Sequence, residues 1–181
     1  MRRLRRAFLA RDSHVVAPEL LNKLLVAGPC VGRIVEVEAY ASTDPASHTF
    51  RGVTKRNAIM FGRAGHLYVY FTYGMHHCAN VVTGRAGDGQ AVLLRAVTPI
   101  SGIELMAARR GRERNLTDGP GKLCQAFGLD LTANGTDLCT DGGIGLYDDG
   151  VAPPETPLIT PRIGIRVGVD TPWRWVVPTA M

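Results

Sequence analysis

The first candidates for chemistry are two carboxylates and a tyrosine within residues 32–40, which read Gly-Arg-Ile-Val-Glu-Val-Glu-Ala-Tyr. β-Branched residues dominate this segment and predict a strand. Because side chains alternate between the faces of a strand, Ile34, Glu36, Glu38 and Tyr40 are expected to share one face. A carboxylate beside apolar and aromatic surface needs an arranged partner, and such a group suits a general base. The alternative is that the two glutamates mark the solvent-exposed face of the sheet.

Arg95 is a second candidate, because it interrupts an apolar segment at residues 90–97. That segment also predicts a strand, with Leu93 and Arg95 on the same face. A buried guanidinium requires an anionic partner. Glu38 or a phosphate would meet this requirement, and a purely structural ion pair is the simpler alternative.

Residues 65–82 predict a β-hairpin with an aromatic residue at its tip. Tyr73 and Gly74 stand where a two-residue turn is expected. A large aromatic side chain at such a tip is hard to bury, so Tyr73 is expected to meet a binding partner. The return arm is expected to present His76, Cys78, Asn80 and Val82 on one face.

Further aromatic side chains precede and follow the expected turn. Tyr40, His48, Tyr68 and Tyr70 could hold a planar ligand between flat faces, and stacking contributes about 1–3 kcal/mol per nucleic-acid base. Ordinary packing within the hairpin is the alternative. Alternation alone does not separate Tyr68 from Tyr70, since both lie on the same face of the first arm.

The segment Gly119-Pro-Gly-Lys122 leads into an apolar helical pattern that ends at Gly128. Free N–H groups at a helix N-terminus can bind an anion, and Lys122 would add a positive charge. The spacing does not match the P-loop pattern G-x-x-x-x-G-K-[ST]. An ordinary turn into a helix is therefore an equal alternative.

Neither a metal site nor a cofactor site is expected. The neighbours His76, His77 and Cys78 would point to alternate faces of a strand, which disfavours one shared ion. The sequence also lacks the G-x-S-x-G pattern of serine hydrolases. No C-x-x-C pair is present, and reduced, mostly buried thiols are expected for the four cysteines, Cys30, Cys78, Cys124 and Cys139.

The rest of the pattern predicts the elements that must position these residues. Residues 17–26 predict a short helix with Pro18 in its first turn, and residues 99–110 predict a helix opened by Pro99. Residues 42–64 form a polar stretch whose length indicates a functional loop. The stretch from Asp141 to Pro157 is expected to be irregular, and residues 161–168 predict a last strand.

Length and charge bound the class of protein. The chain has 181 residues, with 21 basic and 16 acidic side chains and a net charge of +5. No repeat or domain-length linker is present, so residues 1–181 are expected to form a single domain of the α+β class with a mainly antiparallel sheet. The basic excess excludes a strongly acidic chain and favours an anionic partner such as nucleic acid. Its short apolar stretches predict no membrane span, and the N-terminus lacks the apolar run of a targeting peptide.

Eighteen of the 21 basic residues are arginine, whose planar fork suits phosphate and base recognition. A GC-rich genome, whose codons favour arginine over lysine, is an equally good explanation. Together with the aromatic slot and the isolated carboxylate, the charge suits an enzyme that removes a base from a duplex.

Several specific segments occur in one order from about residue 8 to residue 175, nearly the whole chain. They are Arg-Ile-Val-Glu-Val-Glu-Ala-Tyr at 33–40, Ala-Ser-His at 46–48, Arg-Asn at 56–57, Met-Phe-Gly at 60–62, Gly-His-Leu-Tyr-Val-Tyr-Phe-Thr-Tyr-Gly-Met at 65–75, Asn-Val-Val at 80–82, Gly-Asp-Gly at 87–89, Val-Leu-Leu-Arg-Ala at 92–96 and Gly-Pro-Gly-Lys-Leu-Cys-Gln at 119–125. In these segments the chain resembles the alkyladenine (3-methyladenine) DNA glycosylases, also called the methylpurine glycosylase family.

The resemblance implies roles residue by residue. Glu38 falls on the general base that activates the attacking water, and Arg95 falls on the arginine that helps to hold that water. Tyr40 and His48 fall on one wall of the base pocket, and Tyr70 falls on the opposite wall.

Other positions match residues that contact DNA in the family. Tyr73 falls on the hairpin-tip residue that inserts into the minor groove, and Met75 falls beside it. Asn80 falls on the residue that crowds the exocyclic amine of a normal guanine. A basic residue common in relatives is replaced by Val53, which removes one phosphate contact. The expected contacts to the DNA backbone are Lys55, Arg56 and Lys122.

The family fold is a curved antiparallel sheet with a projecting hairpin and surrounding helices. The implied reaction is hydrolysis of the N-glycosidic bond of alkylated or deaminated purines, without metal, Schiff base or strand cleavage. The implied partner is double-stranded DNA containing damaged purines, bound by a monomer in the cytoplasm at the nucleoid. The alternative is a catalytically silent damaged-DNA-binding module of the same fold, although Glu38 and Arg95 together argue against it.

Overall fold

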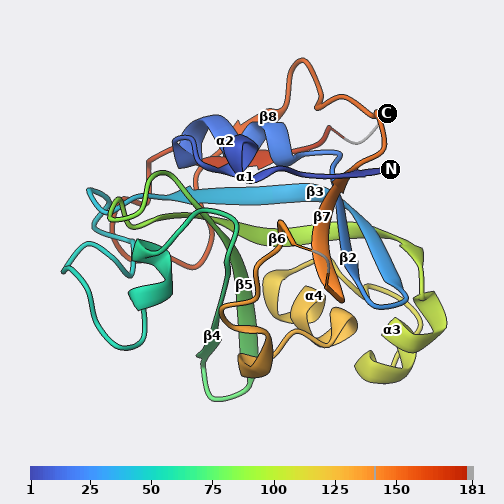
Figure 1. Cartoon of the computed structure of the whole chain (residues 1–181). Coiled ribbons are helices and arrows are strands. Elements are labelled where there is room, and N and C mark those ends of the chain that lie inside the picture. The colour runs from blue at the N-terminus through green and yellow to red at the C-terminus, as the bar shows by residue number, and fades with distance from the viewer. Residues whose placement is uncertain (141, 179–181) are drawn as a thin grey trace.

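Antiparallel strands form the framework of the computed structural model, which describes residues 1–140 and 142–178 (Figure 1). The strands are β1 (Arg2–Arg3), β2 (Leu24–Ala27), β3 (Cys30–Tyr40), β4 (Leu67–Thr72), β5 (His76–Thr83), β6 (Gln90–Ser101), β7 (Ile144–Asp148), β8 (Leu158–Thr160) and β9 (Arg174–Val176). Within the described ranges they form one sheet with the neighbour order β1-β7-β2-β3-β6-β5-β4, and β9 joins β3 to β8. All the pairings are antiparallel, which confirms the expected α+β class with a curved antiparallel sheet.

Short helices cover both faces of this sheet (Figure 1). They are α1 (Arg6–Leu9), α2 (Ser13–Leu20), α3 (Ile103–Arg110) and α4 (Pro120–Phe127), with 3-10 turns at Ala58–Phe61 and Leu131–Ala133. In Figure 1, α1 and α2 lie on one side of β3, and α4 lies on the other. No helix in residues 1–140 and 142–178 is long and apolar enough to cross a membrane.

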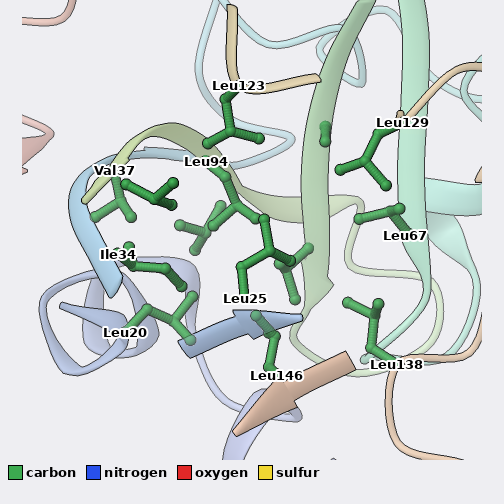
Figure 2. Packing of buried hydrophobic residues seen from close by; sticks show 14 of the residues in the cluster. Leu20, Leu25, Ile34, Val37, Leu67, Leu94, Leu123, Leu129, Leu138 and Leu146 are labelled. Atoms are coloured by element: carbon green, nitrogen blue, oxygen red, sulfur yellow. The ribbon is translucent and has the colours of Figure 1, made fainter. Parts of the chain in front are cut away.

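The larger of two clusters of buried apolar side chains joins these layers. Figure 2 shows members of this cluster from α2, β2, β3, β4, β6, α4 and β7 in one core. Leu94 of β6 and Leu123 of α4 are fully buried, as is Leu25 of β2. Burying a leucine side chain contributes about 1.5–3 kcal/mol, so this core holds β3 and β6 firmly in register.

The pairing of β3 with β6 contains an irregularity that strict alternation does not predict. The register shifts between Ile34 and Glu36 and again between Glu36 and Val37, so that Val35 and Arg95 have no residue opposite them. Ile34 therefore belongs to the core together with Val37, and the expectation that it shares a face with Glu38 was wrong. β-Bulges of this kind bend a strand and re-aim its side chains.

The helix predicted over residues 17–26 was wrong in both of its limits. α2 begins earlier, because the Asp12 side chain accepts a hydrogen bond from the His14 N–H and caps the helix. The helix ends at Leu20, so that Pro18 lies near its end, and Leu24–Ala27 instead pairs with β3 and with β7. A short apolar run is compatible with helix or strand, and here the two flanking strands decide it.

Pro99 does not open a helix as expected. β6 continues through Pro99, which lies opposite Gly32, and ends at Ser101. The helix α3 starts at Ile103, after Gly102 adopts a positive φ of 72°. The helix predicted for the Gly119 segment is confirmed as α4, which ends where Gly128 adopts a φ of 69°.

The two C-terminal expectations were also wrong. Within the stretch expected to be irregular, Ile144–Asp148 forms β7 and pairs with β1 and β2, while Asp141 lies outside the described residues. Residues 161–168 are irregular instead of forming a strand, and Gly164 has a positive φ of 78°. The last strand is β9, which carries Trp175. The secondary structure of these stretches depends on pairing with strands far away in the sequence, which a local sequence pattern does not predict.

Candidate active site

A cavity of about 600 Å³ lies beside the β4–β5 hairpin. It is lined by residues from the long loop at 45–60, by the strands β3 to β6, by Pro120 and by residues 163–167. Seven of the residues singled out from the sequence are among its lining residues, namely Tyr40, His48, Arg56, Tyr70, Tyr73, Asn80 and Arg95. The fold thus brings together side chains that lie far apart in the sequence.

Glu38 lies directly behind this cavity and is fully buried, with 0% of its side chain exposed. Its Oε1 accepts a hydrogen bond from the Ile163 N–H at 2.8 Å, and its Oε2 accepts one from the Tyr40 hydroxyl at 2.9 Å. Arg95 Nη1 lies 3.3 Å from Oε1. A carboxylate has about four acceptor positions, so these two hydrogen bonds and the ion pair with Arg95 leave room for a further donor, such as a water. The alternative that Glu38 marks a solvent-exposed face is excluded.

Arg95 binds two carboxylates. Its Nε donates to Glu36 Oε1 at 2.7 Å, and its Nη1 faces Glu38. Arg174 Nε donates to the same Glu36 oxygen at 2.6 Å. Burial would raise the pKa of Glu36, but the hydrogen bonds from Arg174 and Arg95 outweigh it and hold the pKa below its ordinary value. The anionic partners that the sequence required for Arg95 are therefore Glu36 and Glu38.

The depressed pKa of Glu36 predicts a loss of stability in acid. The unfolded chain takes up this proton at a higher pH than the folded protein, so the free energy of unfolding falls as the pH drops below about 4.5. Glu36→Gln should lower the stability at pH 7 and flatten its decline between about pH 5 and pH 3. Thermal unfolding across this range would measure both effects, with exposed Glu155→Gln as the control. Parallel pH profiles of Glu36→Gln and the wild type would contradict the prediction.

Tyr40 and Tyr70 line the cavity. Burial raises the pKa of both hydroxyls far above the ordinary value, and the charge of Glu38 adds to the effect at Tyr40. Both groups therefore stay protonated at neutral pH. The protonated Tyr40 hydroxyl donates a hydrogen bond to Glu38. This hydrogen bond confirms that Tyr40 and Glu38 share one face of β3.

His48 lies closer to Tyr70 than expected. The two ring centroids are 4.5 Å apart in an edge-on arrangement, and His48 Nδ1 shares a hydrogen bond of 3.0 Å with the Tyr68 hydroxyl. A base stacked between two rings needs about 3.5 Å on each side, so none fits between His48 and Tyr70 here. His48 is exposed as a whole residue, yet desolvation of its ring by the surrounding side chains and the charge of Arg56 lower its pKa. The placement of His48 and Tyr70 on opposite walls around a bound base stays a prediction.

The hairpin tip has the predicted turn. Tyr73 and Gly74 both have positive φ values, 51° and 68°, and the Met75 N–H donates to the Thr72 carbonyl at 3.3 Å. Glycine adopts this conformation freely, whereas a tyrosine there is uncommon. The Tyr73 side chain is 78% exposed and Met75 is 69% exposed, so the tip presents two large apolar side chains to solvent.

Asn80 and Cys78 face the cavity from β5. Cys78 lies opposite Tyr70 and Asn80 lies opposite Tyr68 in the hairpin. Asn80 is buried and its Nδ2 donates to the Tyr68 carbonyl at 3.2 Å, which holds its side chain in place. Burial raises the pKa of the Cys78 thiol, which stays protonated. Alternation along the return arm had put both residues on one face.

The three expected DNA-backbone contacts differ in their surroundings. Lys55 is exposed on the long loop. Arg56 lies with its guanidinium carbon 5.4 Å from the centre of the Tyr70 ring and lines the cavity. Lys122 is 3.0 Å from Asp118 one turn away, so part of its charge is already compensated. Of the three, Lys55 is the basic residue most open to an outside anion.

One part of the site was missed from the sequence. Residues 163–167 line the cavity, although their alternating pattern predicted a strand. The available signal was Gly164, because glycine within a strand pattern can mark a break in the strand, and Gly164 indeed has a positive φ. Tyr68 and Tyr70, which alternation could not separate, both line the cavity, and the Tyr68 hydroxyl shares a hydrogen bond with His48. In the described ranges, His, Cys, Asp and Glu side chains form no group of three or more suited to a metal ion.

Comparison with known proteins agrees with this geometry. A model of the methylpurine-DNA glycosylase (MPG) family matches residues 7–181. A protein of Burkholderia lata is 55% identical over 181 residues, which covers 97% of this chain and 87% of that protein. Proteins of Carboxydothermus hydrogenoformans and Methanoculleus marisnigri are each 50% identical, over 95% and 93% of this chain and 93% and 92% of their own lengths. All three are named as 3-methyladenine DNA glycosylases. This chain therefore belongs to the methylpurine-DNA glycosylase family.

Proposed function

We propose that this protein is a monofunctional DNA glycosylase that removes alkylated and deaminated purines from double-stranded DNA and so begins base excision repair. The observation that carries the proposal is Glu38, a fully buried carboxylate behind an aromatic cavity, oriented by two hydrogen bonds and by an ion pair with Arg95. Such a group is poised to act on a water at the inner end of a base pocket. Family membership and the names of the relatives support the same reaction.

In the proposed reaction Glu38 accepts a proton from water as the water oxygen forms a bond to C1′ of the damaged nucleotide. The bond between C1′ and the purine nitrogen breaks, and its electron pair leaves with the purine. A cationic alkylated purine leaves as the neutral base, whereas a neutral purine takes up one proton from solvent as it leaves, and Glu38 returns its own proton to solvent. The products are the free purine and an abasic site in an intact strand. Arg95 forms ion pairs with Glu38 and Glu36 and so keeps Glu38, the general base, in place. A positively charged or weakly bonded purine leaves more easily, so Glu38 mainly positions and deprotonates water.

The cavity walls support selection of the flipped base. Tyr40 and Tyr70 offer aromatic faces for stacking, while the His48 ring packs edge-to-face with the Tyr70 ring. Asn80 is held by the Tyr68 carbonyl, where it would crowd the exocyclic amine of a normal guanine. A purine that reaches this cavity must first leave the duplex, because a base inside the stack is not accessible. Tyr73, with Met75 beside it, would fill the gap.

Phosphate contacts by exposed basic residues predict a salt-dependent affinity. Each neutralised phosphate contributes a slope of about −0.9 in log affinity against log salt. Lys55→Gln should reduce the magnitude of this slope by about 0.9, whereas Lys122→Gln should reduce it by less, since Asp118 already pairs with Lys122. Titrations of a lesion duplex at several salt concentrations would measure both slopes.

A control for the salt experiment is Arg2→Gln. Arg2 is 77% exposed on β1, at the end of the sheet order opposite to β4, and should leave the slope unchanged. An unchanged slope for Lys55→Gln would remove Lys55 from the DNA-binding surface.

The proposed function is tested by a panel of duplexes that each carry one lesion, with release of the free base measured without added metal. The panel should include 3-methyladenine, 7-methylguanine, hypoxanthine and etheno-adenine. Release of at least one alkylated purine and retention of normal guanine are expected. Binding without release from any member would identify the protein as a catalytically silent module.

A further inference from the structure

Arg162 and Asp44 form an ion pair that lies wholly inside the protein, next to the cavity. Their side chains are 0% and 1% exposed. Arg162 Nη1 and Nη2 both donate to the Asp44 carboxylate, Nη2 to Oδ1 at 3.0 Å. Nη1 also donates to the Ala39 carbonyl oxygen at 3.1 Å. The bidentate geometry fixes the guanidinium in position and orientation.

The main effect of this ion pair is to fix the position of the Arg162 guanidinium, and its contribution to folding stability is secondary. Removing two charges from water is costly, and apolar side chains of similar volume often stabilise a protein equally well. Two apolar side chains would not fix the orientation of either group, because hydrophobic contacts are not directional. A buried bidentate pair therefore has its main use where one group must be held at one place.

Two contacts lead from Arg162 to the carboxylate of Glu38. The next residue, Ile163, donates its N–H to Glu38 Oε1 at 2.8 Å. The Arg162 guanidinium carbon lies 4.6 Å from the centre of the Tyr40 ring, and the Tyr40 hydroxyl donates to Glu38 Oε2 at 2.9 Å. The ring of Trp173 lies 5.0 Å from the same guanidinium carbon. Arg162 thus contacts Tyr40 and directly precedes Ile163, the two residues that donate hydrogen bonds to Glu38.

The segment that carries Arg162 has little else to hold it. Residues 161–167 form no helix or strand, and none of them makes a backbone–backbone hydrogen bond with another described residue. Ile163 is about half exposed, so burial of its own side chain does not fix its backbone. The buried side chain of Arg162 is therefore the anchor that sets the position of the Ile163 N–H.

We propose that Arg162, held by Asp44, is a positioning residue for the general base. It places the Ile163 N–H and the Tyr40 ring, and the Ile163 N–H and the Tyr40 hydroxyl orient the Glu38 carboxylate toward the attacking water. The inference rests on the proposed glycosylase function, because it assigns how the base of that reaction is oriented. Loss of this orientation slows bond cleavage, because misplacing a catalytic group by about 1 Å can reduce a rate a hundredfold.

The test compares Arg162→Lys and Asp44→Asn with the wild type. Lysine keeps the charge but has no planar fork, and asparagine keeps the size but not the charge. The matched control is Arg33→Lys, because Arg33 makes a bidentate pair with Asp149, at 3.3 and 2.7 Å, away from the cavity. Single-turnover base release is measured with the best duplex of the lesion panel. Affinity is measured with the same duplex carrying a 2′-fluoro lesion nucleotide, whose glycosidic bond resists hydrolysis.

Both site variants should release base about tenfold to a hundredfold more slowly while keeping an affinity within about threefold of wild type. Arg33→Lys should match the wild type in both measurements. In the Glu38→Gln background, Arg162→Lys should slow release by less than about twofold, because a residue that acts through Glu38 has no effect once Glu38 is inactive. This loss of additivity distinguishes positioning from general stabilisation.

Three results would overturn the proposal. The first is a folded Arg162→Lys variant with a lower melting temperature but wild-type release. The second is an equal slowing in the presence and absence of Glu38. The third is a wild-type rate of base release by Asp44→Asn. This result decides against Arg162 as a positioning residue even if Arg162→Lys does not fold at the assay temperature. Failure of the wild type to release any base would instead refute the proposed function itself.

Discussion

Glu38→Gln is expected to slow base release by a factor of about 10²–10⁴ while affinity for a lesion duplex stays near the wild-type value. Glutamine has nearly the shape of glutamate, but its amide cannot accept the proton of the attacking water. It also places an NH₂ group beside the two hydrogen-bond donors and the Arg95 guanidinium, which in the wild type face Glu38 Oε1 and Oε2. Single-turnover release and a binding titration on the same duplex separate the chemical step from recognition.

The control for this experiment is Glu155→Gln, which makes the same chemical change at an exposed position. It should leave both release and affinity unchanged. Near-normal turnover by Glu38→Gln would remove Glu38 from the mechanism. A parallel loss of affinity and melting temperature would instead mean that Glu38 serves mainly to hold β3, residues 161–167 and Arg95 together.

Tyr73→Ala is expected to weaken binding to a lesion duplex by about fivefold to 150-fold, with almost no change in the melting temperature. The range follows from the contribution of aromatic stacking, about 1–3 kcal/mol per base. Stability should change little, because Tyr73 is 78% exposed at the hairpin tip and belongs to neither buried cluster. Titration of the variant with lesion and undamaged duplexes, together with thermal unfolding, would measure these effects.

Tyr73→Phe provides the matched control, since it keeps the ring and the turn position and removes only the hydroxyl. It should bind like the wild type if the ring fills the gap in the duplex. A large fall in melting temperature for Tyr73→Ala would identify Tyr73 as a packing residue. Equal affinity of Tyr73→Ala and wild type would show that the tip does not enter the duplex.

Features that depend on neighbouring residues could be predicted from the sequence. The hairpin is confirmed, because Tyr73 and Gly74 form its turn and the flanking arms pair from Leu67 to Val81. The strand around Glu38 and the helix that begins at Pro120 are confirmed for the same reason. Periodicity and turn chemistry act over a few residues, so a single sequence contains the information that they need.

Other elements could not be predicted because their neighbours decide them. Leu24–Ala27 forms a strand since β3 and β7 flank it, and Pro99 lies in a strand opposite Gly32. The bulge at Val35 and Arg95 is likewise a property of the pair of strands. It explains why Ile34 enters the core while Glu36 and Glu38 both reach Arg95.

The sequence by itself identified the candidate residues for the chemistry and the family to which the ordered motifs belong. Only the tertiary structure decided how those residues meet. The hydrogen bond from Ile163 to Glu38 spans 125 positions, and the contacts of Arg162 with Asp44 span 118. The burial of Glu38, the choice of Glu36 and Glu38 as partners of Arg95, and the edge-to-face packing of His48 with Tyr70 depend on such contacts. No local pattern encodes them, because each arises only when the core has brought distant segments of the chain together.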